Sequence, residues 1–429
     1  MSTHLIIVGA GQAAAQTILT LTQKRYPGRI TVVGDEPYPP YQRPPLSKKY
    51  LSGELERERL FVRPTEFYEQ HGVTLILGAK AERLEPVQQR LTLADGRQLD
   101  YDRLLLATGS RVRKIDVPGA DLAGIHYLRT IADADGILGG LGPDKRLVIV
   151  GAGYIGLEIA AVARAHRAHV TVLEATDRVM ARVVCPEVGT FYRGVHEAAG
   201  VEIACDTAVR GFAGDDHVTG VIASDGREYP CDVAVVGIGI VPETELAEQA
   251  GLVCDDGIRV DEYACTSEPQ IYAAGDCTNH PNAVLGRRIR LESVHNAIEQ
   301  SKTAALSLLG EPAAYAQIPW FWSDQYDLKL QIAGISTGYD RVVLRGDPAE
   351  RKFAAYYLRD SRLIAVDAIN SPKDFLLGKR LVAQGAMPSP QRIEDTTADL
   401  ATVESGDPTG ISDDGEVQGA SGAGLDRQA

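Results

Sequence analysis

The sequence predicts an α/β fold in which two parallel-sheet units of similar design are followed by a smaller, mainly antiparallel domain. Short β-branched apolar runs alternate with longer helical patterns through most of the 429 residues, as in strands joined by crossover helices. A glycine-rich loop follows the first strand of each unit, and the two loops lie about 140 residues apart. From residue 319 onward, strand-like stretches follow one another directly, which favours an antiparallel arrangement.

The first unit is predicted to have strands at residues 5–8, 30–33 and 103–107 and a helix over 13–23. Its first strand leads into a G-x-G-x-x-A loop made of Gly9, Gly11 and Ala14. The unpaired amides and positive dipole end of the following helix suit a pyrophosphate, and the glycines let phosphate oxygens approach the backbone. Asp35, just past the second strand, is placed to accept hydrogen bonds from ribose hydroxyls. The alternative is a purely structural turn.

The second unit is predicted to have strands at residues 147–150, 170–173 and 232–237 and a helix that ends near 165. Its loop carries the complete G-x-G-x-x-G pattern with Gly151, Gly153 and Gly156. Glu174 ends the second strand, where a carboxylate pairs with a free 2′-hydroxyl and repels a 2′-phosphate. We therefore expect NADH to be preferred over NADPH, although Arg178 and Arg182 follow closely and leave the strictness of this preference open.

Two dinucleotide loops in one chain imply two dinucleotides, and a bound flavin with a diffusible nicotinamide is the simplest pair. Gly109, Gly239 and Gly275 each follow a predicted strand, as expected where the backbone closes around such ligands. Asp276 is placed to hydrogen-bond a ribityl hydroxyl, with a turn or helix cap as the alternative. The pattern therefore predicts an electron-transfer enzyme.

The cysteines narrow the chemistry. The six cysteines form no C-x-x-C pair and no zinc-ligand spacing, and the first of them is Cys185. No thiol therefore stands in the segment after the first loop, where disulfide reductases carry theirs. Cys277, next to Asp276, is interpreted as structural. We expect electrons to leave the flavin without a thiol intermediary.

The composition of the chain limits which partners it is expected to bind and where in the cell it is expected. The chain has 44 basic and 58 acidic residues, a net charge of -14, which argues against nucleic acid or an anionic membrane as the main partner. No secretory leader and no apolar run of membrane-spanning length are recognised, so a cytoplasmic protein is expected. Residues 405–429 are rich in Gly, Asp and Ser and are predicted to be a disordered acidic tail, with partner recruitment as the alternative.

Several motifs together resemble the FAD-dependent NADH:ferredoxin reductases, the family of putidaredoxin and rhodocoxin reductases and of dioxygenase reductase components. They are YQRPPLSK at 41–48, ATG at 107–109, GAGYIGLE at 151–158, AGD at 274–276, ESV at 292–294 and PWFWSDQ at 319–325. The resemblance covers roughly residues 4–370 and implies a glutathione-reductase-like architecture with two Rossmann-like domains. The implied domains are FAD-binding 1–112 with 240–318, NAD-binding 113–239, and a C-terminal α+β domain 319–404.

The resemblance also implies the site residues. Those assigned to FAD are Gly9, Gly11, Ala13, Ala14, Asp35, Arg43, Lys48, Ala81, Ala107, Thr108, Gly109, Arg129, Gly275, Asp276, Val294, His295 and Trp322. Those assigned to NAD are Gly151, Gly153, Tyr154, Ile155, Gly156, Glu158, Glu174 and Gly239. Lys48 and Glu158 are the implied catalytic pair, although a lysine in a proline-rich loop and a glutamate on a helix are more often solvated. A helix over 294–308 is expected to direct its N-terminus at the flavin pyrimidine ring.

The implied reaction passes a hydride from NADH to FAD and then single electrons to a 2Fe-2S ferredoxin. That ferredoxin would serve a cytochrome P450 or an aromatic-ring dioxygenase. Arg287, Arg288, Arg290 and Lys302 are the predicted docking face for an acidic ferredoxin, with an ordinary solvated turn as the alternative. Two other functions stay open: an NADH oxidase or diaphorase, and a redox-sensing interaction protein similar to apoptosis-inducing factor.

Overall fold

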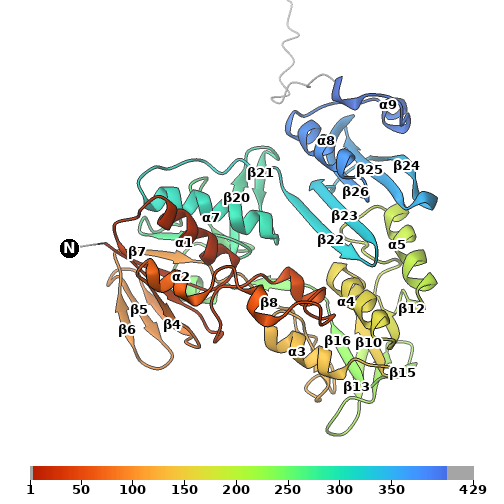
Figure 1. Cartoon of the computed structure of the whole chain (residues 1–429), viewed down its shortest axis with the longest axis horizontal. Helices are drawn as coiled ribbons and strands as arrows, with labels where there is room; N and C mark the ends of the chain where they lie inside the picture. The colour runs from red at the N-terminus through yellow and green to blue at the C-terminus, as the bar shows by residue number, and fades with distance from the viewer. Residues whose placement is uncertain (1–2, 403–429) are drawn as a thin grey trace, which may run out of the picture.

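The computed structural model describes residues 3–402, so the predicted tail at 405–429 lies outside the described residues. Figure 1 shows three parts, each built around its own five-stranded sheet: the N-terminal part, the yellow and green middle part, and the blue C-terminal part. The N-terminal part also contains the segment that returns after the middle part. No helix in residues 3–402 is both long and apolar enough to cross a bilayer.

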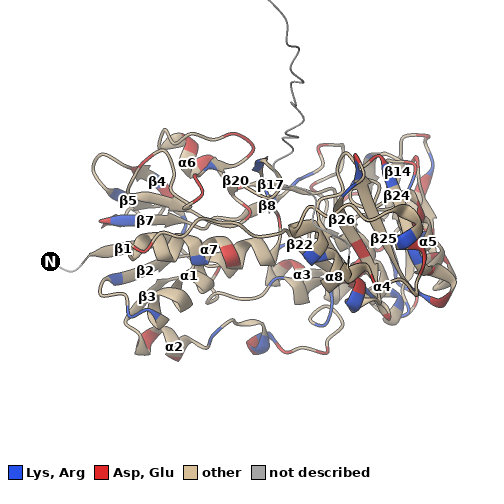
Figure 2. Ribbon diagram, turned by 90° about the horizontal axis from the view of Figure 1, so that it is seen from above, with Lys and Arg blue, Asp and Glu red and all other residues tan. Residues whose placement is uncertain are grey.

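The first sheet is parallel, in the order β19-β7-β1-β2-β3. Its strands are β1 (His4–Val8), β2 (Arg29–Val33), β3 (Val73–Ile76), β7 (Arg103–Leu106) and β19 (Ile271–Ala273). Leu5 and Ile7 pack on one side against α1 (Gln12–Gln23) and α7 (Val294–Leu308). Ile6 and Val8 pack on the other side against the small sheet β4-β5-β6. Figure 2 shows β4 and β5 on the side of the first sheet opposite α1 and α7. Burial on both sides explains why these strands are apolar throughout.

The elements around this sheet are short. They are β4 (Ala81–Glu85), β5 (Arg90–Leu93), β6 (Gln98–Asp100), β18 (Ile258–Arg259), β20 (Thr278–Asn282), β21 (Arg287–Ile289), α2 (Thr65–Gln70), α6 (Glu245–Gln249) and the 3-10 turns η1 (Pro44–Ser47) and η2 (Arg57–Leu60). The antiparallel pair β8 (Ser110–Val112) and β17 (Ile240–Pro242) carries the chain into the middle part and back. The two crossings therefore lie side by side.

The middle sheet is also parallel, in the order β12-β11-β10-β16-β9. Its strands are β9 (Ile125–His126), β10 (Arg146–Val150), β11 (His169–Leu173), β12 (Val201–Ala204) and β16 (Val233–Val236), and its helices are α3 (Ile131–Gly140), α4 (Tyr154–Ala165) and α5 (Pro186–Ala198). Ile149 faces the core shared with α4 and α5, whereas Val148 and Val150 face the sheet β13 (Val209–Ala213), β14 (Gly220–Ala223) and β15 (Glu228–Pro230).

The C-terminal part is an antiparallel sheet in the order β22-β23-β26-β25-β24, as predicted for this region. It comprises β22 (Trp320–Gln325), β23 (Leu328–Gly334), β24 (Arg341–Asp347), β25 (Lys352–Arg359) and β26 (Arg362–Ile369), followed by α8 (Pro372–Ala383) and α9 (Pro390–Glu394), with 3-10 turns η3 (Pro348–Glu350) and η4 (Leu400–Thr402). Alternation along β25 sends Tyr357 into the core shared with α4 and α5, and Tyr356 into the core under α8 and α9. One face of this sheet therefore packs on the middle part.

Candidate active site

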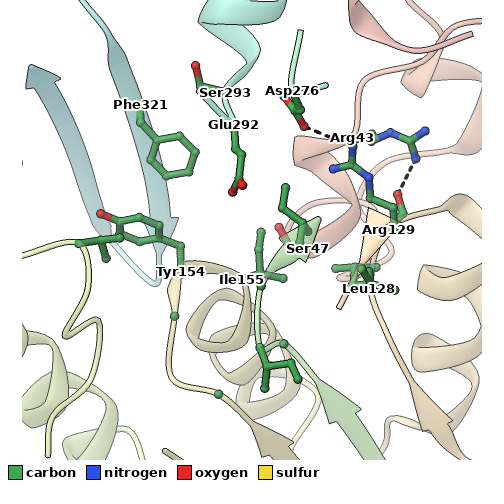
Figure 3. A pocket seen from close by; sticks show the side chains of 18 of the residues that line it. Arg43, Ser47, Leu128, Arg129, Tyr154, Ile155, Asp276, Glu292, Ser293 and Phe321 are labelled. Carbon is green, nitrogen blue, oxygen red and sulfur yellow. Dashed lines mark hydrogen bonds and ion pairs between the residues drawn. The ribbon is translucent and has the colours of Figure 1, made fainter. Parts of the chain in front are cut away.

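A cavity of about 900 Å³ lies where all three parts meet. It is bordered by the glycine loops that follow β1 and β10, by the turn η1, by the start of α7 and by β22. In Figure 3 the side chains come from these separate segments and converge on one open space, with Arg43 and Arg129 on one side and Tyr154 and Phe321 on the other. Crevices at the carboxyl ends of parallel strands are the usual ligand sites of such sheets.

The first glycine loop has the shape that a phosphate cradle needs. Gly9 has φ +103, and a Cβ there would lie 2.2 Å from the Ala107 carbonyl oxygen, so the loop passes directly over the neighbouring strand. A Cβ at Gly11 would instead meet nothing within 4 Å, which leaves open space at the start of α1. A group with phosphate oxygens fits this space and would face the amides of the helix N-terminus.

Two arginines, Arg43 and Arg129, lie together on one side of the cavity (Figure 3). Arg129 pairs with Asp276 at 3.3 Å, and Arg43 donates to the Arg129 carbonyl oxygen at 2.6 Å and pairs with Glu36 at 2.8 Å (Figure 3). Burial lowers the pKa of Arg129, and the charge of Arg43 adds to that effect. The Arg129 Nε is buried without a partner within residues 3–402. An unpaired donor in this position fits an anionic cofactor such as the FAD pyrophosphate.

The second glycine loop repeats the arrangement. Gly151 has φ +104, and a Cβ at Gly156 would lie 2.2 Å from the Gly151 carbonyl oxygen, so only glycine allows α4 to begin so close to β10. A Cβ at Gly153 would meet nothing within 4 Å. Glu174 accepts from the Ala152 amide at 2.7 Å and from the Thr176 amide at 2.9 Å. These bonds fix its carboxylate at the edge of the cavity, where a ribose fits.

The predicted catalytic pair is a buried ion pair. Lys48 Nζ lies 2.6 Å from Glu158 Oε2, and the Glu158 side chain is only 1% exposed. Burial raises the pKa of Glu158, while Lys48 and the hydroxyl groups of Ser47 and Ser323 lower it. The pair places one positive and one negative group beside the space between the two glycine loops, where flavin and nicotinamide would meet.

Aromatic rings close the side of the cavity toward the C-terminal part. Tyr154, the first residue of α4, lies 5.0 Å from Phe321 between ring centroids (Figure 3). Trp320 lies 5.5 Å from Trp322, and both tryptophans line the cavity. Because Ile155 is 41% exposed on this apolar wall, the space beside it suits a flat ring system entering from solvent.

Comparison with protein families identifies the chain. Residues 3–301 match the family model described as pyridine nucleotide-disulphide oxidoreductase, and residues 320–403 match the model described as reductase C-terminal. The chain belongs to the pyridine nucleotide-disulphide oxidoreductase family. The predicted class is therefore confirmed: the protein is an oxidoreductase whose cofactors are FAD and a nicotinamide dinucleotide, and the residues of the cavity fit both.

Individual proteins are similar over almost the whole chain. The 5,5'-dehydrodivanillate O-demethylase ferredoxin reductase subunit of Sphingobium sp. is 42% identical over 92% of this chain and 97% of its own length. Rhodocoxin reductase of Rhodococcus erythropolis is 41% identical over 92% of this chain and 93% of its own. The crystal structure of the covalent putidaredoxin reductase–putidaredoxin complex contains a chain that superposes with a TM-score of 0.90 at 40% identity, covering 92% and 96% of the two chains. These relatives confirm the resemblance inferred from the motifs.

Most of the predicted site residues line the cavity, but Ala14, Ala81, Gly156 and His295 do not. Ala14 lies in the core between α1 and the first sheet, and Ala81 begins β4, paired with Leu93. Gly156 acts through close packing against the Gly151 loop. His295 turns its ring onto Trp320, with 5.4 Å between centroids. Their contribution to cofactor binding remains a prediction, and two of them, Gly156 and His295, contact the wall residues Gly151 and Trp320 directly.

Two arginines of the predicted docking cluster, Arg288 and Arg290, are held by contacts within the protein itself. Arg288 donates to the Val260 carbonyl at 2.7 Å and to the Asn279 side chain at 3.1 Å, so it fastens β20 and β21 to the adjoining loop. Arg290 forms ion pairs with both Asp256 and Glu292, and its side chain is 16% exposed. The docking role predicted for Arg287, Arg288, Arg290 and Lys302 remains a prediction, but Arg288 and Arg290 are not free cations. Arg290 pairs with Glu292, two residues on, and with the more distant Asp256, and Arg288 binds the Val260 carbonyl and the Asn279 side chain.

Other residues of the site had no role predicted from the sequence. Ser47 and Ser323, which belong to the motifs at 41–48 and 319–325, both donate to Glu158. Lys379, on α8, lies with its Nζ 5.9 Å from the Trp320 ring centroid. Its place beside the cavity follows from tertiary packing alone, since nothing in the sequence around it points to a cofactor.

No cysteine among residues 3–402 lines the cavity. Cys277 is fully buried, its pKa is raised by that burial, and its sulfur lies 3.5 Å from the Ala274 carbonyl oxygen as a weak donor. All six cysteines are free thiols. The interpretation of Cys277 as structural agrees with this position.

Proposed function

We propose that this protein is an NADH-dependent ferredoxin reductase: it accepts a hydride from NADH and delivers electrons one at a time to a 2Fe-2S ferredoxin. The observation that carries the proposal is a cavity shared by two dinucleotide loops; within the described part of the chain, no cysteine belongs to its wall. The flavin supplies the conversion between two-electron and one-electron transfer. The names of two similar relatives, a ferredoxin reductase subunit and a rhodocoxin reductase, support the choice of acceptor. The electrons would serve a cytochrome P450 or an aromatic-ring dioxygenase.

We further propose that the ferredoxin docks over the end of the cavity beside Trp320, on the basic docking face formed by Lys302 of α7 and Lys379 of α8. Burial lowers the pKa of His295 to about 4. The charges of Lys379 and Lys302 add to this effect and Glu299, which pairs with Lys302, opposes it, so both lysines lie near this one ring. That ring contacts Trp320, whose own ring lines the cavity. Leu376, 66% exposed on α8, adds an apolar contact. A cationic rim with an apolar centre suits an acidic electron-transfer protein.

Nicotinamide preference follows from Glu174. We propose NADH over NADPH because this carboxylate borders the cavity, whereas Arg178 pairs with Asp177 and is not part of the wall. Arg182 does line the cavity and is the residue that would admit some NADPH. The free thiols are consistent with a reducing, cytoplasmic location, which we propose as well.

Anaerobic stopped-flow reduction of the purified yellow protein tests the proposal. NADH should bleach the flavin, and the reduced protein should then transfer electrons to an added acidic 2Fe-2S ferredoxin much faster than to oxygen. A protein that is colourless as purified, or a flavin that NADH does not reduce, would refute the function. Reoxidation by oxygen that outruns transfer to several such ferredoxins would instead favour an NADH oxidase.

A further inference from the structure

Glu158 stands at the end of a buried chain of hydrogen bonds that runs away from the cavity. Its Oε2 atom accepts from Lys48 at 2.6 Å and from the Ser47 hydroxyl at 2.5 Å. Its Oε1 atom accepts from the Ser323 hydroxyl at 2.6 Å. The carboxylate is thus held on both sides, by η1 and the following residue on one oxygen and by β22 on the other.

The chain continues behind Ser323. Gln325 Nε2 lies 3.2 Å from the Ser323 hydroxyl oxygen, and Gln325 Oε1 lies 2.8 Å from His196 Nε2. The other His196 nitrogen, Nδ1, lies 3.1 Å from the Tyr326 hydroxyl. Ser323, Gln325 and His196 are each at most 1% exposed. The chain therefore runs through the interior and reaches solvent only at Tyr326, which is 38% exposed.

The chemistry of these groups fixes the direction of the donors. An amide oxygen only accepts, so His196 Nε2 must carry the hydrogen in its bond to Gln325. Burial lowers the pKa of His196, so the ring is neutral and its Nδ1 accepts from Tyr326. The Gln325 amide group donates to Ser323, which has its single hydrogen directed at Glu158. Every donor in the chain therefore points toward the Glu158 carboxylate.

This common direction of the donors favours a negative charge on Glu158, where the chain ends. Hydrogen bonds that all donate toward one acceptor polarise one another, and a bond to an ionised group is stronger than one to a neutral group. The other titratable groups that act on Glu158 are Lys48, Tyr154 and Tyr192. Lys48 favours the ionised carboxyl group, and burial raises the pKa of both tyrosines so that they stay neutral. Burial of Glu158 itself opposes ionisation, so the donors matter.

We propose that Ser323, Gln325 and His196 are positioning residues that keep Glu158 ionised and paired with Lys48, and so balance the charge beside the flavin. The inference rests on the proposed function, because it assigns Glu158 a place beside the hydride-transfer site. The network joins the C-terminal sheet to α4 and α5 of the middle part, so the β22 strand takes part in the electrostatics of the site as well as in its shape.

The test uses the FAD-loaded protein with Ser323→Ala, and Ser301→Ala serves as the matched control. Both serines are fully buried, but the Ser301 hydroxyl has no hydrogen-bond partner within residues 3–402. The infrared band of the protonated Glu158 carboxyl group, identified by its loss in Glu158→Gln, is titrated against pH. Losing a donor to a buried carboxylate should move the midpoint of this titration upward by about one to two pH units. Ser301→Ala should leave it in place.

A second variant, and the rate of flavin reduction by NADH, make the test specific to this hydrogen-bond chain. Gln325→Leu retains the Ser323 hydroxyl but removes the groups behind it, so it should shift the midpoint in the same direction by a smaller amount. The acidic limb of NADH-driven flavin reduction should follow the infrared midpoint in each variant. An unchanged midpoint in Ser323→Ala, or an equal shift in Ser301→Ala, overturns the inference. Because the infrared titration needs neither NADH nor ferredoxin, a shift in a protein that fails to reduce ferredoxin would refute the proposed function alone.

Discussion

Reversing one charge on the proposed docking face should weaken the use of ferredoxin without affecting the reaction with NADH. Lys379 is the residue to reverse, because its ammonium group contacts the Trp320 ring, whereas Lys302 already pairs with Glu299 at 2.7 Å. Lys379→Glu changes the local charge by two units. Trp320 lies between this lysine and the cavity, so a ferredoxin seated here would come close to the flavin.

The magnitude follows from Coulomb's law. Two unit charges about 10 Å apart in water interact by about 0.4 kcal/mol, so a change of two units facing two carboxylates of a partner amounts to about 1.6 kcal/mol. This corresponds to about a fifteenfold increase in KM for ferredoxin at low salt. At 0.1 M salt the screening length is about 10 Å, which reduces the expected increase to about threefold. The effect should therefore shrink as salt is added.

The assay is steady-state ferredoxin reduction at two ionic strengths, together with stopped-flow reduction of the flavin by NADH. Lys145→Glu is the matched control, since Lys145 lies just before β10, at the amino end of the second sheet, and the cavity lies at the carboxyl ends of the strands. The variant and the control should show the same rate of flavin reduction. Equal losses of ferredoxin activity in both variants, or an increase in KM that does not depend on salt, would refute the docking face.

Three further predictions concern the cofactor loops and the core. Gly153→Ala should raise KM for NADH at least about tenfold in steady-state assays while FAD stays bound, because the added methyl group would enter the space left for the dinucleotide. Gly194→Ala is the control, since a Cβ at Gly194 also meets nothing within 4 Å. Glu174→Ala should lower the ratio of NADH to NADPH efficiency by roughly tenfold, whereas an unchanged ratio would assign the preference elsewhere. Burial raises the pKa of Asp367 to about 7, so its carboxyl group ionises at lower pH in the unfolded chain and stability should fall between about pH 4 and 7. Asp367→Asn, compared by urea unfolding at both pH values, should remove up to about 4 kcal/mol of that loss.

Sequence reasoning succeeds where a local pattern and its structural cause coincide. The helix predicted over 294–308 is α7 (Val294–Leu308), because the Ser293 side chain caps it by accepting from the Asn296 amide and the apolar positions repeat at helical spacing. The two glycine loops could be recognised in the sequence because the structure requires glycine there. Gly9 and Gly151 have positive φ, and a Cβ at Gly156 would clash with the Gly151 carbonyl oxygen. Both parallel sheets follow from their continuous apolar strands.

The same reasoning fails where a side chain finds its partner far away in the chain. Arg288 and Arg290 are dense in sequence and look like a surface patch, but Asp256, Asn279 and Val260 are positioned to bind them only after β18, β20 and β21 assemble. Charge density along a sequence counts cations without their counter-ions. Only the folded contacts distinguish an arginine that fastens loops from one that remains free for a partner.

The buried charge of Glu158 shows how the three parts of the chain depend on one another. A lone carboxylate that is 1% exposed would be protonated or would destabilise the fold, so its retention requires donors in fixed positions. Those donors come from η1 in the N-terminal part and from β22 in the C-terminal part, while Glu158 itself lies on α4 in the middle part. Separating the N-terminal part from the middle part would leave the charge without Lys48, and separating the C-terminal part would remove the Ser323 donor. The electrostatics of the site therefore oppose opening of the interfaces around the cavity, where the proposed hydride transfer would take place.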